Sequence, residues 1–170
     1  MELKYEKQII TEFVKGKVLD LGCGDGRLYN LLSKNASYIG IDVAETSIKQ
    51  AQLNYPLGEF IIMDASKLDF LDKTFNIVFC GFNALSEVWD LDKVLLEIKR
   101  VLKRKGLLIF SFQNRLYYKH LLRTYEKNGI RFKPLSSKEV INLYGKYFNY
   151  IKHYGNFYEK YPYYIFSNRK

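Results

Sequence analysis

A glycine-rich turn directly after a short apolar run is the feature that most constrains the fold of this chain. The stretch reads VLDLGCGDGRL, residues 18–28, and its glycines follow the spacing G-x-G-x-G. A glycine turn between a strand and a helix is typical of open α/β sheets, which bind ligands at the carboxyl ends of their strands. The spacing differs from the G-x-G-x-x-G of dinucleotide-binding folds, so a nicotinamide cofactor cannot be assumed.

Short apolar runs alternate with longer amphipathic segments over the first two thirds of the chain. The alternation predicts βα units and a parallel sheet. The expected strands are residues 18–21, 38–42, 60–63, 75–80 and 107–112, and the expected helices are residues 3–14, 26–33, 46–54 and 92–102, with Gly106 ending the last helix.

The pattern changes after residue 112. We expect a helix at 137–147, capped by Ser136 or Ser137, and two aromatic strands near 150–154 and 163–167. Strands this close in sequence should pair antiparallel. The predicted fold is therefore α/β, a doubly wound Rossmann-like sheet of seven strands, mostly parallel with a C-terminal antiparallel hairpin strand and with helices on both faces.

Length and composition limit the class of protein. A chain of 170 residues suits one domain, 1–170, and its two cysteines cannot by themselves form a zinc site or a disulfide framework, so no metal is expected. No apolar stretch approaches a membrane span and the N-terminus is charged, so we expect a cytoplasmic protein with no membrane partner. The net charge of +9 favours anionic partners such as nucleic acid, although a merely basic surface explains it equally well.

Three acids fall at the ends of three successive predicted strands: Asp20, Asp42 and Asp64. Acids beside a glycine turn disfavour a pyrophosphate and suit a ligand with cationic or hydroxyl groups. Asp42, 22 residues after Asp20, can accept the hydroxyls of a ribose. Asp64 can accept from an exocyclic amine such as that of adenine. A ribose, an adenine and a cationic tail together make S-adenosylmethionine.

These motifs resemble those of the class I S-adenosylmethionine-dependent methyltransferases over about residues 18–112. VLDLGCGDG resembles the first motif of that family, IGIDVAETSIKQA the second-strand motif, FIIMDA the adenine-contacting segment and FNIVFCGFNAL the fourth-strand motif. The resemblance implies S-adenosylmethionine as cofactor and a methyltransferase activity. It implies methionine contacts from Asp20, Gly22 and Gly24, ribose and adenine contacts from Asp42, Val43, Asp64 and Ala65, and pocket closure by Gly81 and Phe82.

One departure from the family pattern stands before the fifth strand. The chain has KRKGLL where the family often has Pro-Gly-Gly, and only Gly106 is retained. The bases around it, Lys99, Arg100, Lys103, Arg104 and Lys105, are interpreted first as solvated charges that complement a helix dipole.

The catalytic residues are poorly marked in the sequence. The chain has neither the Asn/Asp-Pro-Pro-aromatic motif of enzymes that methylate amino groups nor a Pro-Cys nucleophile, and Cys80 is expected to be a buried strand-end residue. Candidates near the expected substrate mouth are Asn83, Glu87 and His120, and Trp89 could form a wall of the pocket. Each also has an ordinary structural interpretation, as a helix-start acid for Glu87 or a packing residue for His120.

The acceptor is not fixed by the sequence. The basic, tyrosine-rich segment 114–134 is longer than a connection requires and could act as a lid over the acceptor, or be a fixed surface helix. We favour a small-molecule acceptor slightly over RNA, with a protein third. A non-catalytic partner subunit that only binds the cofactor is the alternative from another class, and the oligomeric state is open.

Overall fold

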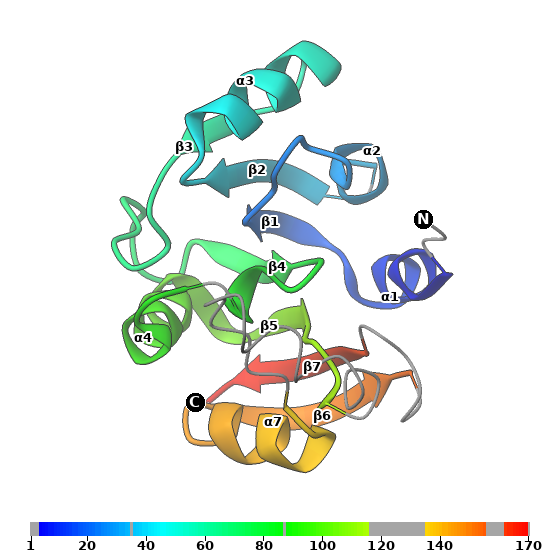
Figure 1. The fold of residues 1–170 in the computed structure, drawn as a ribbon, viewed down its shortest axis with the longest axis vertical. Coiled ribbons are helices and arrows are strands. Elements are labelled where there is room, and N and C mark those ends of the chain that lie inside the picture. The colour runs from blue at the N-terminus through cyan, green and yellow to red at the C-terminus, as the bar shows by residue number, and fades with distance from the viewer. Residues whose placement is uncertain (1–3, 35, 87, 116–134, 156–161, 170) are drawn as a thin grey trace, which may run out of the picture.

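The strands of the described residues form one seven-stranded sheet in the order β3-β2-β1-β4-β5-β7-β6 (Figure 1). The structure is a computed structural model that describes residues 4–34, 36–86, 88–115, 135–155 and 162–169. The strands are β1 Gly16–Leu21, β2 Ala36–Asp42, β3 Phe60–Ile62, β4 Phe75–Cys80, β5 Leu102–Ser111, β6 Phe148–Tyr154 and β7 Tyr163–Asn168. The first five pair in parallel, and β7 pairs antiparallel with both β5 and β6. The predicted fold is confirmed, including the hairpin that completes the sheet.

Helices cover both faces of this sheet. They are α1 Lys4–Phe13, α2 Tyr29–Leu32, α3 Glu45–Asn54, α4 Leu91–Val101 and α7 Ser137–Tyr144, with a short 3-10 helix at Ala84–Ser86. Side chains alternate between the faces along β1. Val18 packs in the cluster that contains α1, α2 and α3, whereas Leu19 packs in the cluster that contains α4 and α7. Figure 1 shows α1 and α4 on opposite sides of the sheet.

The sequence explains where the two helices of the second face begin. The side chain of Asp90 accepts a hydrogen bond from Lys93 N at the start of α4, as expected of an N-cap. Ser136 and Glu139 form a reciprocal capping box at the start of α7, so Ser136 is the cap of the two serines predicted. The buried residues of α4 recur at helical spacing and face the sheet: Val94, Leu95, Ile98 and Val101.

Several expected boundaries are wrong: the strand expected at 107–112 begins at Leu102, and the helix expected at 137–147 ends at Tyr144. The helix expected at 26–33 is only α2, Tyr29–Leu32, because Gly26 has a φ of +79° and belongs to the turn. Gly106 does not end α4. That helix stops at Val101, and Leu102 already pairs with Phe75 as the first residue of β5.

Two further expectations remain predictions. The single-domain organisation, residues 1–170, is not tested by the sheet alone. The suggested lid, 114–134, falls almost wholly outside the described residues, of which it includes only Asn114 and Arg115. Among the described helices, none combines the length and the apolar character that crossing a membrane requires.

Candidate functional site

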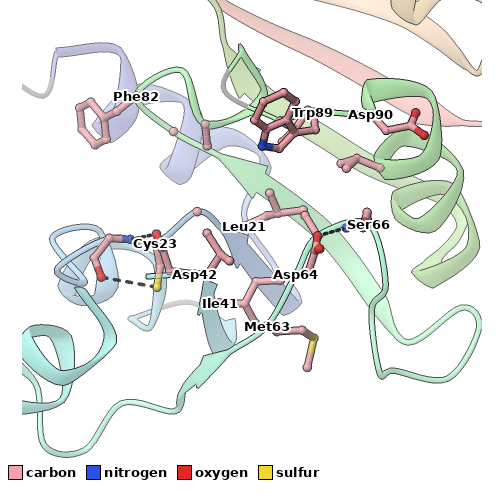
Figure 2. Close-up of a pocket in the computed structure, with 18 of the residues that line it drawn as sticks. Leu21, Cys23, Ile41, Asp42, Met63, Asp64, Ser66, Phe82, Trp89 and Asp90 are labelled. Carbon is pink, nitrogen blue, oxygen red and sulfur yellow. Dashed lines mark hydrogen bonds between the residues drawn. The ribbon is translucent and has the colours of Figure 1, made fainter. Parts of the chain in front are cut away.

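A pocket of about 540 Å³ opens at the carboxyl ends of the first four parallel strands (Figure 2). Ligands bind at this edge in open α/β sheets, and the volume is within the usual range for a small-molecule site. In Figure 2, Phe82 and Trp89 lie across the pocket from Asp42, Met63 and Asp64. The lining residues are Leu21, Gly22, Cys23, Gly24, Arg27, Ile41, Asp42, Val43, Met63, Asp64, Ala65, Ser66, Gly81, Phe82, Ala84, Val88, Trp89, Asp90, Lys93 and Val94.

The glycine turn that follows β1 forms one wall of the pocket. Gly22 and Gly24 have φ values of +74° and +55°, in the left-handed region that favours glycine. The N–H groups of Gly22 and Cys23 both donate to Ile41 O, at 2.8 and 2.9 Å, which holds the turn against the end of β2. A Cβ on Gly22 would lie 2.6 Å from the Cβ of Ala84, whereas a Cβ on Gly24 would meet nothing within 4 Å. Glycine at position 22 thus permits close packing against Ala84, and glycine at position 24 leaves space in the pocket.

Asp42 ends β2 and connects the glycine turn to the next helix. Its Oδ2 accepts from Gly24 N and its Oδ1 accepts from Ala44 N, both at 2.9 Å. These two bonds fix the carboxylate at the pocket wall, and each oxygen retains a lone pair for a further donor. The side chain thus fits the ribose-binding role expected of it.

Asp64 lies in the loop after β3 at the opposite end of the pocket floor. Its Oδ1 accepts from Ser66 N at 2.7 Å (Figure 2). Hydrogen bonds from Ser66 hold the pKa of this carboxyl below its usual range, with a smaller contribution from the charge of Lys93. Asp64 is therefore a charged acceptor at neutral pH, as an amine contact requires.

Asp20 is the one predicted cofactor residue that does not line the pocket. Its side chain is 1% exposed and its Oδ2 accepts from the Tyr38 hydroxyl at 2.8 Å. The alternation of β1 explains this position, because Asp20 shares the face of Val18 and lies with Tyr38 on the side of the sheet that α1, α2 and α3 cover. Burial raises the pKa of Asp20 to about 7, and the negative charge of Asp42 adds to this, while the Tyr38 hydrogen bond opposes it.

This buried acid predicts a pH dependence of stability. The pKa of Asp20 is higher in the folded chain than in the unfolded chain, so the protonated folded state is favoured and stability falls as the pH rises toward about 7. Between about pH 5 and pH 8 the original chain should lose about 3 kcal/mol of unfolding free energy through Asp20, because this interval includes about two pH units below the folded pKa and each corresponds to about 1.4 kcal/mol. The Asp20→Asn variant should lack this loss. Denaturant titrations at both pH values measure it.

Asp25→Asn is the matched control, because this acid of the same turn is exposed and pairs with Arg27 at the surface. An Asp20→Asn variant with the pH profile of the original chain would contradict the buried-acid assignment.

The turn after β4 lines the pocket on the side opposite to Asp42 and Asp64 (Figure 2). Phe82 and Asn83 both have positive φ, +49° and +75°, and the guanidinium carbon of Arg27 lies 5.2 Å from the centroid of the Phe82 ring. Non-glycine residues in this region are uncommon and need local support. Asn83 N donates to Ser111 Oγ at 3.0 Å, and Asn83 Oδ1 accepts from Gln113 N at 3.0 Å.

The catalytic candidates are placed unequally. Asn83 is 2% exposed, is absent from the pocket lining and also accepts from Ser86 Oγ, so its contacts hold the turn. Glu87 and His120 lie outside the described residues. Cys80 is fully buried, as expected, and burial raises the pKa of its thiol well above the ordinary value. A catalytic role for the first three stays a prediction.

Eight of the nine residues predicted to bind the cofactor line the pocket, and Asp20 is the one that does not. Sequence reasoning overlooked Arg27, Met63 and Lys93. Arg27 and Met63 adjoin predicted residues in the sequence, and adjacency alone could have suggested them. Lys93 lies in the first turn of α4, and only the fold brings it to Asp64.

The comparison with protein families decides the family. A model described as a methyltransferase domain matches residues 19–110, more than half of the chain. The chain belongs to the class I S-adenosylmethionine-dependent methyltransferase family. The matched residues run from β1 to β5 and include the whole glycine turn. Similar proteins and solved structures described as S-adenosylmethionine-dependent methyltransferases agree that S-adenosylmethionine is the family's cofactor.

Individual relatives of this methyltransferase chain cover different parts of it. It is 36% identical over 115 residues to a demethylmenaquinone methyltransferase of Thermotoga maritima, covering 64% of this chain and 50% of that protein. It is 33% identical over 134 residues to a ubiquinone biosynthesis O-methyltransferase of Coxiella burnetii, covering 71% and 53%.

Among solved structures, a protein of Pyrococcus horikoshii OT3 has a TM-score of 0.81 at 26% identity, covering 99% of this chain and 89% of that one. The chain spans about half the length of the curated relatives it matches.

Proposed function

We propose that this chain transfers a methyl group from S-adenosylmethionine, held in the pocket, to a small planar acceptor. The observation that carries the proposal is the composition of one cavity, in which the glycine turn, Asp42 and Asp64 share a lining with the exposed ring of Trp89. Cofactor-type groups and an aromatic wall thus face the same space. The family membership supports the reaction type.

The residues of the pocket fit the cofactor in size and in chemistry. Gly24 leaves open space for the ligand next to the turn. Asp42 would accept the ribose hydroxyls, Asp64 would accept the adenine amine, and Val43 and Ala65 would flank the ring. Gly81 and Phe82 would close the pocket, and Asp20 would act on the methionine part from outside the pocket lining. These assignments are proposals for each residue.

When bound, S-adenosylmethionine would supply an electrophilic methyl group on its sulfonium, with the thioether of S-adenosylhomocysteine as the leaving group. The work of the chain is to orient the acceptor and to exclude water. Trp89 is 93% exposed and lines the pocket, so its ring offers a planar surface at the mouth. Met63 and Val88 add apolar surface. Such a rim suits an aromatic acceptor.

A small acceptor is favoured because two relatives are described as acting in quinone chemistry, one on demethylmenaquinone and one in ubiquinone biosynthesis. The basic surplus of the chain supports RNA as the second candidate. A non-catalytic cofactor-binding subunit remains the alternative from another class.

The segment 114–134 stays a proposed lid. At its start, Arg115 bonds Glu139 Oε1 at 2.8 Å, which ties that end to α7.

A screen with isotopically labelled S-adenosylmethionine tests this proposal. We expect label transfer to hydroxylated aromatic acceptors such as catechols and hydroquinones. Label in total RNA that disappears after nuclease treatment would instead select RNA. If the chain binds the cofactor but transfers label to no acceptor, the proposed methyl transfer is contradicted and the non-catalytic cofactor-binding subunit is favoured.

Trp89→Ala is the variant that tests the aromatic wall. We expect turnover of a planar acceptor to fall about tenfold, which corresponds to about 1.4 kcal/mol and is within the range for aromatic contacts. Leu57→Ala is the matched control, because Leu57 is also 93% exposed but does not line the pocket. Equal turnover in both variants would remove Trp89 from the acceptor site.

A further inference from the structure

Positive side chains gather at the edge of the sheet opposite to the pocket. The parallel strands begin at this edge, whereas the pocket lies where they end. The cations come from the starts of strands, from the end of α4 and from the residue after β7. We call this set the basic edge, and its members are Lys15, Lys17, Lys34, Lys73, Lys99, Lys103, Arg104, Lys105 and Arg169.

A bulge in β5 supplies three of these cations. Phe75 pairs with Leu102 but Ile77 pairs with Leu107, so four residues of β5 have no partner in β4. Three of the four, Lys103, Arg104 and Lys105, are exposed. Lys105 has a φ of +62°, uncommon for a residue other than glycine. The bulge projects three consecutive charges from the sheet edge.

Asn76 brings cations of neighbouring strands together. Its Oδ1 accepts from the Nζ of Lys103 and from the backbone N of Lys17, both at 3.0 Å. The start of β1 and the bulge of β5 are thus joined through the side chain of Asn76, the second residue of β4. These bonds place the bulge of β5 beside the start of β1, and the Nζ of Lys17 lies 5.3 Å from the centroid of the Phe75 ring at the start of β4.

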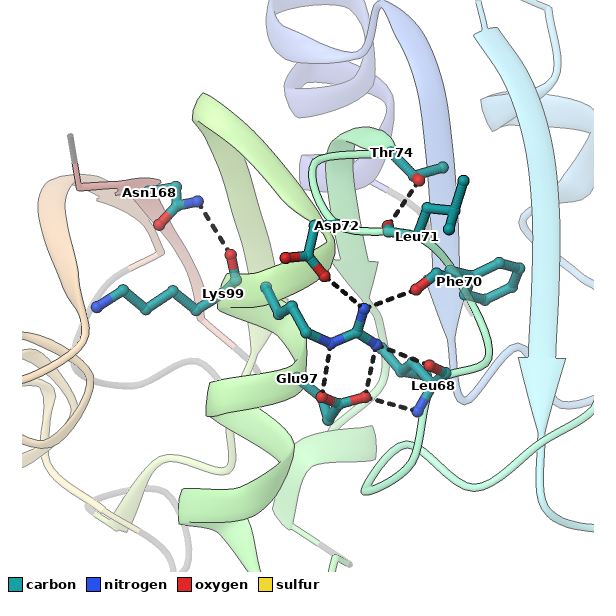
Figure 3. A network of polar contacts seen from close by, with 9 residues as sticks. Leu68, Phe70, Leu71, Asp72, Thr74, Glu97, Lys99 and Asn168 are labelled. Carbon is teal, nitrogen blue, oxygen red and sulfur yellow. Dashed lines mark hydrogen bonds and ion pairs between the residues drawn. The ribbon is translucent and has the colours of Figure 1, made fainter.

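The acids near this edge are already bonded to other groups. The Arg100 guanidinium takes both oxygens of Glu97 and also pairs with Asp72 at 2.9 Å (Figure 3). Glu12 bonds Lys152 and Tyr154. Within the described part of the chain, the ion pairs include no member of the basic edge. Asp69 is the remaining acid of the loop that Arg100 holds, so the edge keeps a strong positive excess.

Helix capping accounts for one of these charges, because Arg169 Nη2 donates to Gly145 O at the C-cap of α7, but it does not account for those at the end of α4. The carbonyls at the end of α4 already have donors, because Asn168 Nδ2 donates to Lys99 O at 3.1 Å and to Leu102 O at 3.0 Å, and Lys73 N donates to Arg100 O at 2.9 Å. Figure 3 shows the Lys99 side chain extending away from this network. The carbonyls at the end of α4 therefore do not need the lysines as donors, and the expected interaction of these charges with the helix dipole stays a prediction. Arg104 and Lys105 are exposed and belong to none of the ion pairs of the described residues, so their charges are available to an external anion.

We propose that the basic edge binds the phosphodiester backbone of a nucleic acid. The basic edge crosses from β2 to β7, four strand spacings of about 4.8 Å, or about 19 Å, which is long enough to meet several phosphates. Contacts of this kind carry affinity but no sequence information. The proposal stands apart from the identity of the methyl acceptor.

A flexible polyanion suits this position better than an anionic membrane. β1 has six residues, so the edge lies about 20 Å from the pocket at about 3.3 Å per residue. A flat bilayer on the basic edge would leave the pocket facing away from it. A nucleic acid can bind the edge and still continue along the surface.

Fluorescence anisotropy tests the proposal with labelled oligouridine RNA and oligothymidine DNA of about 20 nucleotides, between about 50 and 200 mM salt. The test variant is Lys103→Gln, Arg104→Gln, Lys105→Gln together. Because binding releases about 0.7 counterion per neutralised phosphate on a single strand, we expect the salt slope to fall by about 2 and the affinity to fall at least about tenfold. RNA and DNA should behave alike.

The matched control changes charge equally, by Lys7→Gln, Lys49→Gln, Lys138→Gln, all exposed and outside the basic edge. We expect less than about a threefold change in affinity, since non-specific binding follows phosphate contacts. If both triple variants lose affinity equally, the loss reflects net charge and not the basic edge, and the proposal is overturned. So would absence of binding by the original chain, or binding to vesicles of about 30% phosphatidylserine in place of nucleic acid. Thermal unfolding and cofactor titration confirm that each variant is folded.

Discussion

Replacing Gly22 by alanine is expected to lower the free energy of unfolding by about 3 kcal/mol and to weaken cofactor binding at least about tenfold. The new Cβ would lie 2.6 Å from the Cβ of Ala84, and the φ of +74° is unfavourable for any L-residue with a side chain. The turn must then move, and with it the pocket wall it forms. Denaturant titration and calorimetry measure the two losses.

A second substitution separates the two causes. Ala84→Gly removes the one atom within 3 Å of the new Cβ, so the double variant should recover at least about 1 kcal/mol relative to the sum of the single changes. Gly24→Ala provides the comparison without a clash, because it has a φ of +55° but open space around its Cβ. It should cost about 1 kcal/mol in stability. Strict additivity of Gly22→Ala and Ala84→Gly would contradict the packing account.

Asp42→Ala is expected to weaken binding of S-adenosylhomocysteine by about 1–3 kcal/mol, because buried hydroxyls lose a charged acceptor. The same change leaves Gly24 N and Ala44 N without their acceptor, so part of the loss reflects a looser turn. Asp42→Asn keeps one acceptor oxygen, so its affinity for S-adenosylhomocysteine should lie between those of the original chain and of Asp42→Ala. Asp25→Ala, at an exposed position of the same turn, should leave the affinity nearly unchanged. Unchanged affinity in Asp42→Ala would remove Asp42 from the site.

The sequence predicted the parts of the site that depend on local pattern. A glycine turn and an acid at each of two strand ends follow from strand periodicity, and parallel strands bring such residues to one edge. The orientation of Asp20 also follows from that periodicity, because residues two apart on a strand share a face. The resemblance to a family placed Asp20 beside the ligand, and the structure buries its side chain against Tyr38, outside the pocket lining.

Other features depend on contacts between distant residues. Asn83 looks like a catalytic candidate because it follows the fourth strand, but its role in the turn requires Ser111 and Gln113, about 30 positions away. The structural setting of the basic bulge in β5 likewise depends on contacts that the local sequence does not show. The sequence shows the charges of Lys103, Arg104 and Lys105, and only the pairing of Phe75 with Leu102 shows that they belong to β5, beyond the end of α4.

Calorimetric titration of the chain with S-adenosylhomocysteine, and in parallel with NAD, tests the central claim most directly. The account predicts saturable binding of S-adenosylhomocysteine at one site per chain and no binding of NAD, because the acids Asp42 and Asp64 face the pocket and suit hydroxyl and amine donors but not a pyrophosphate. Tight binding of NAD with no binding of S-adenosylhomocysteine would contradict it.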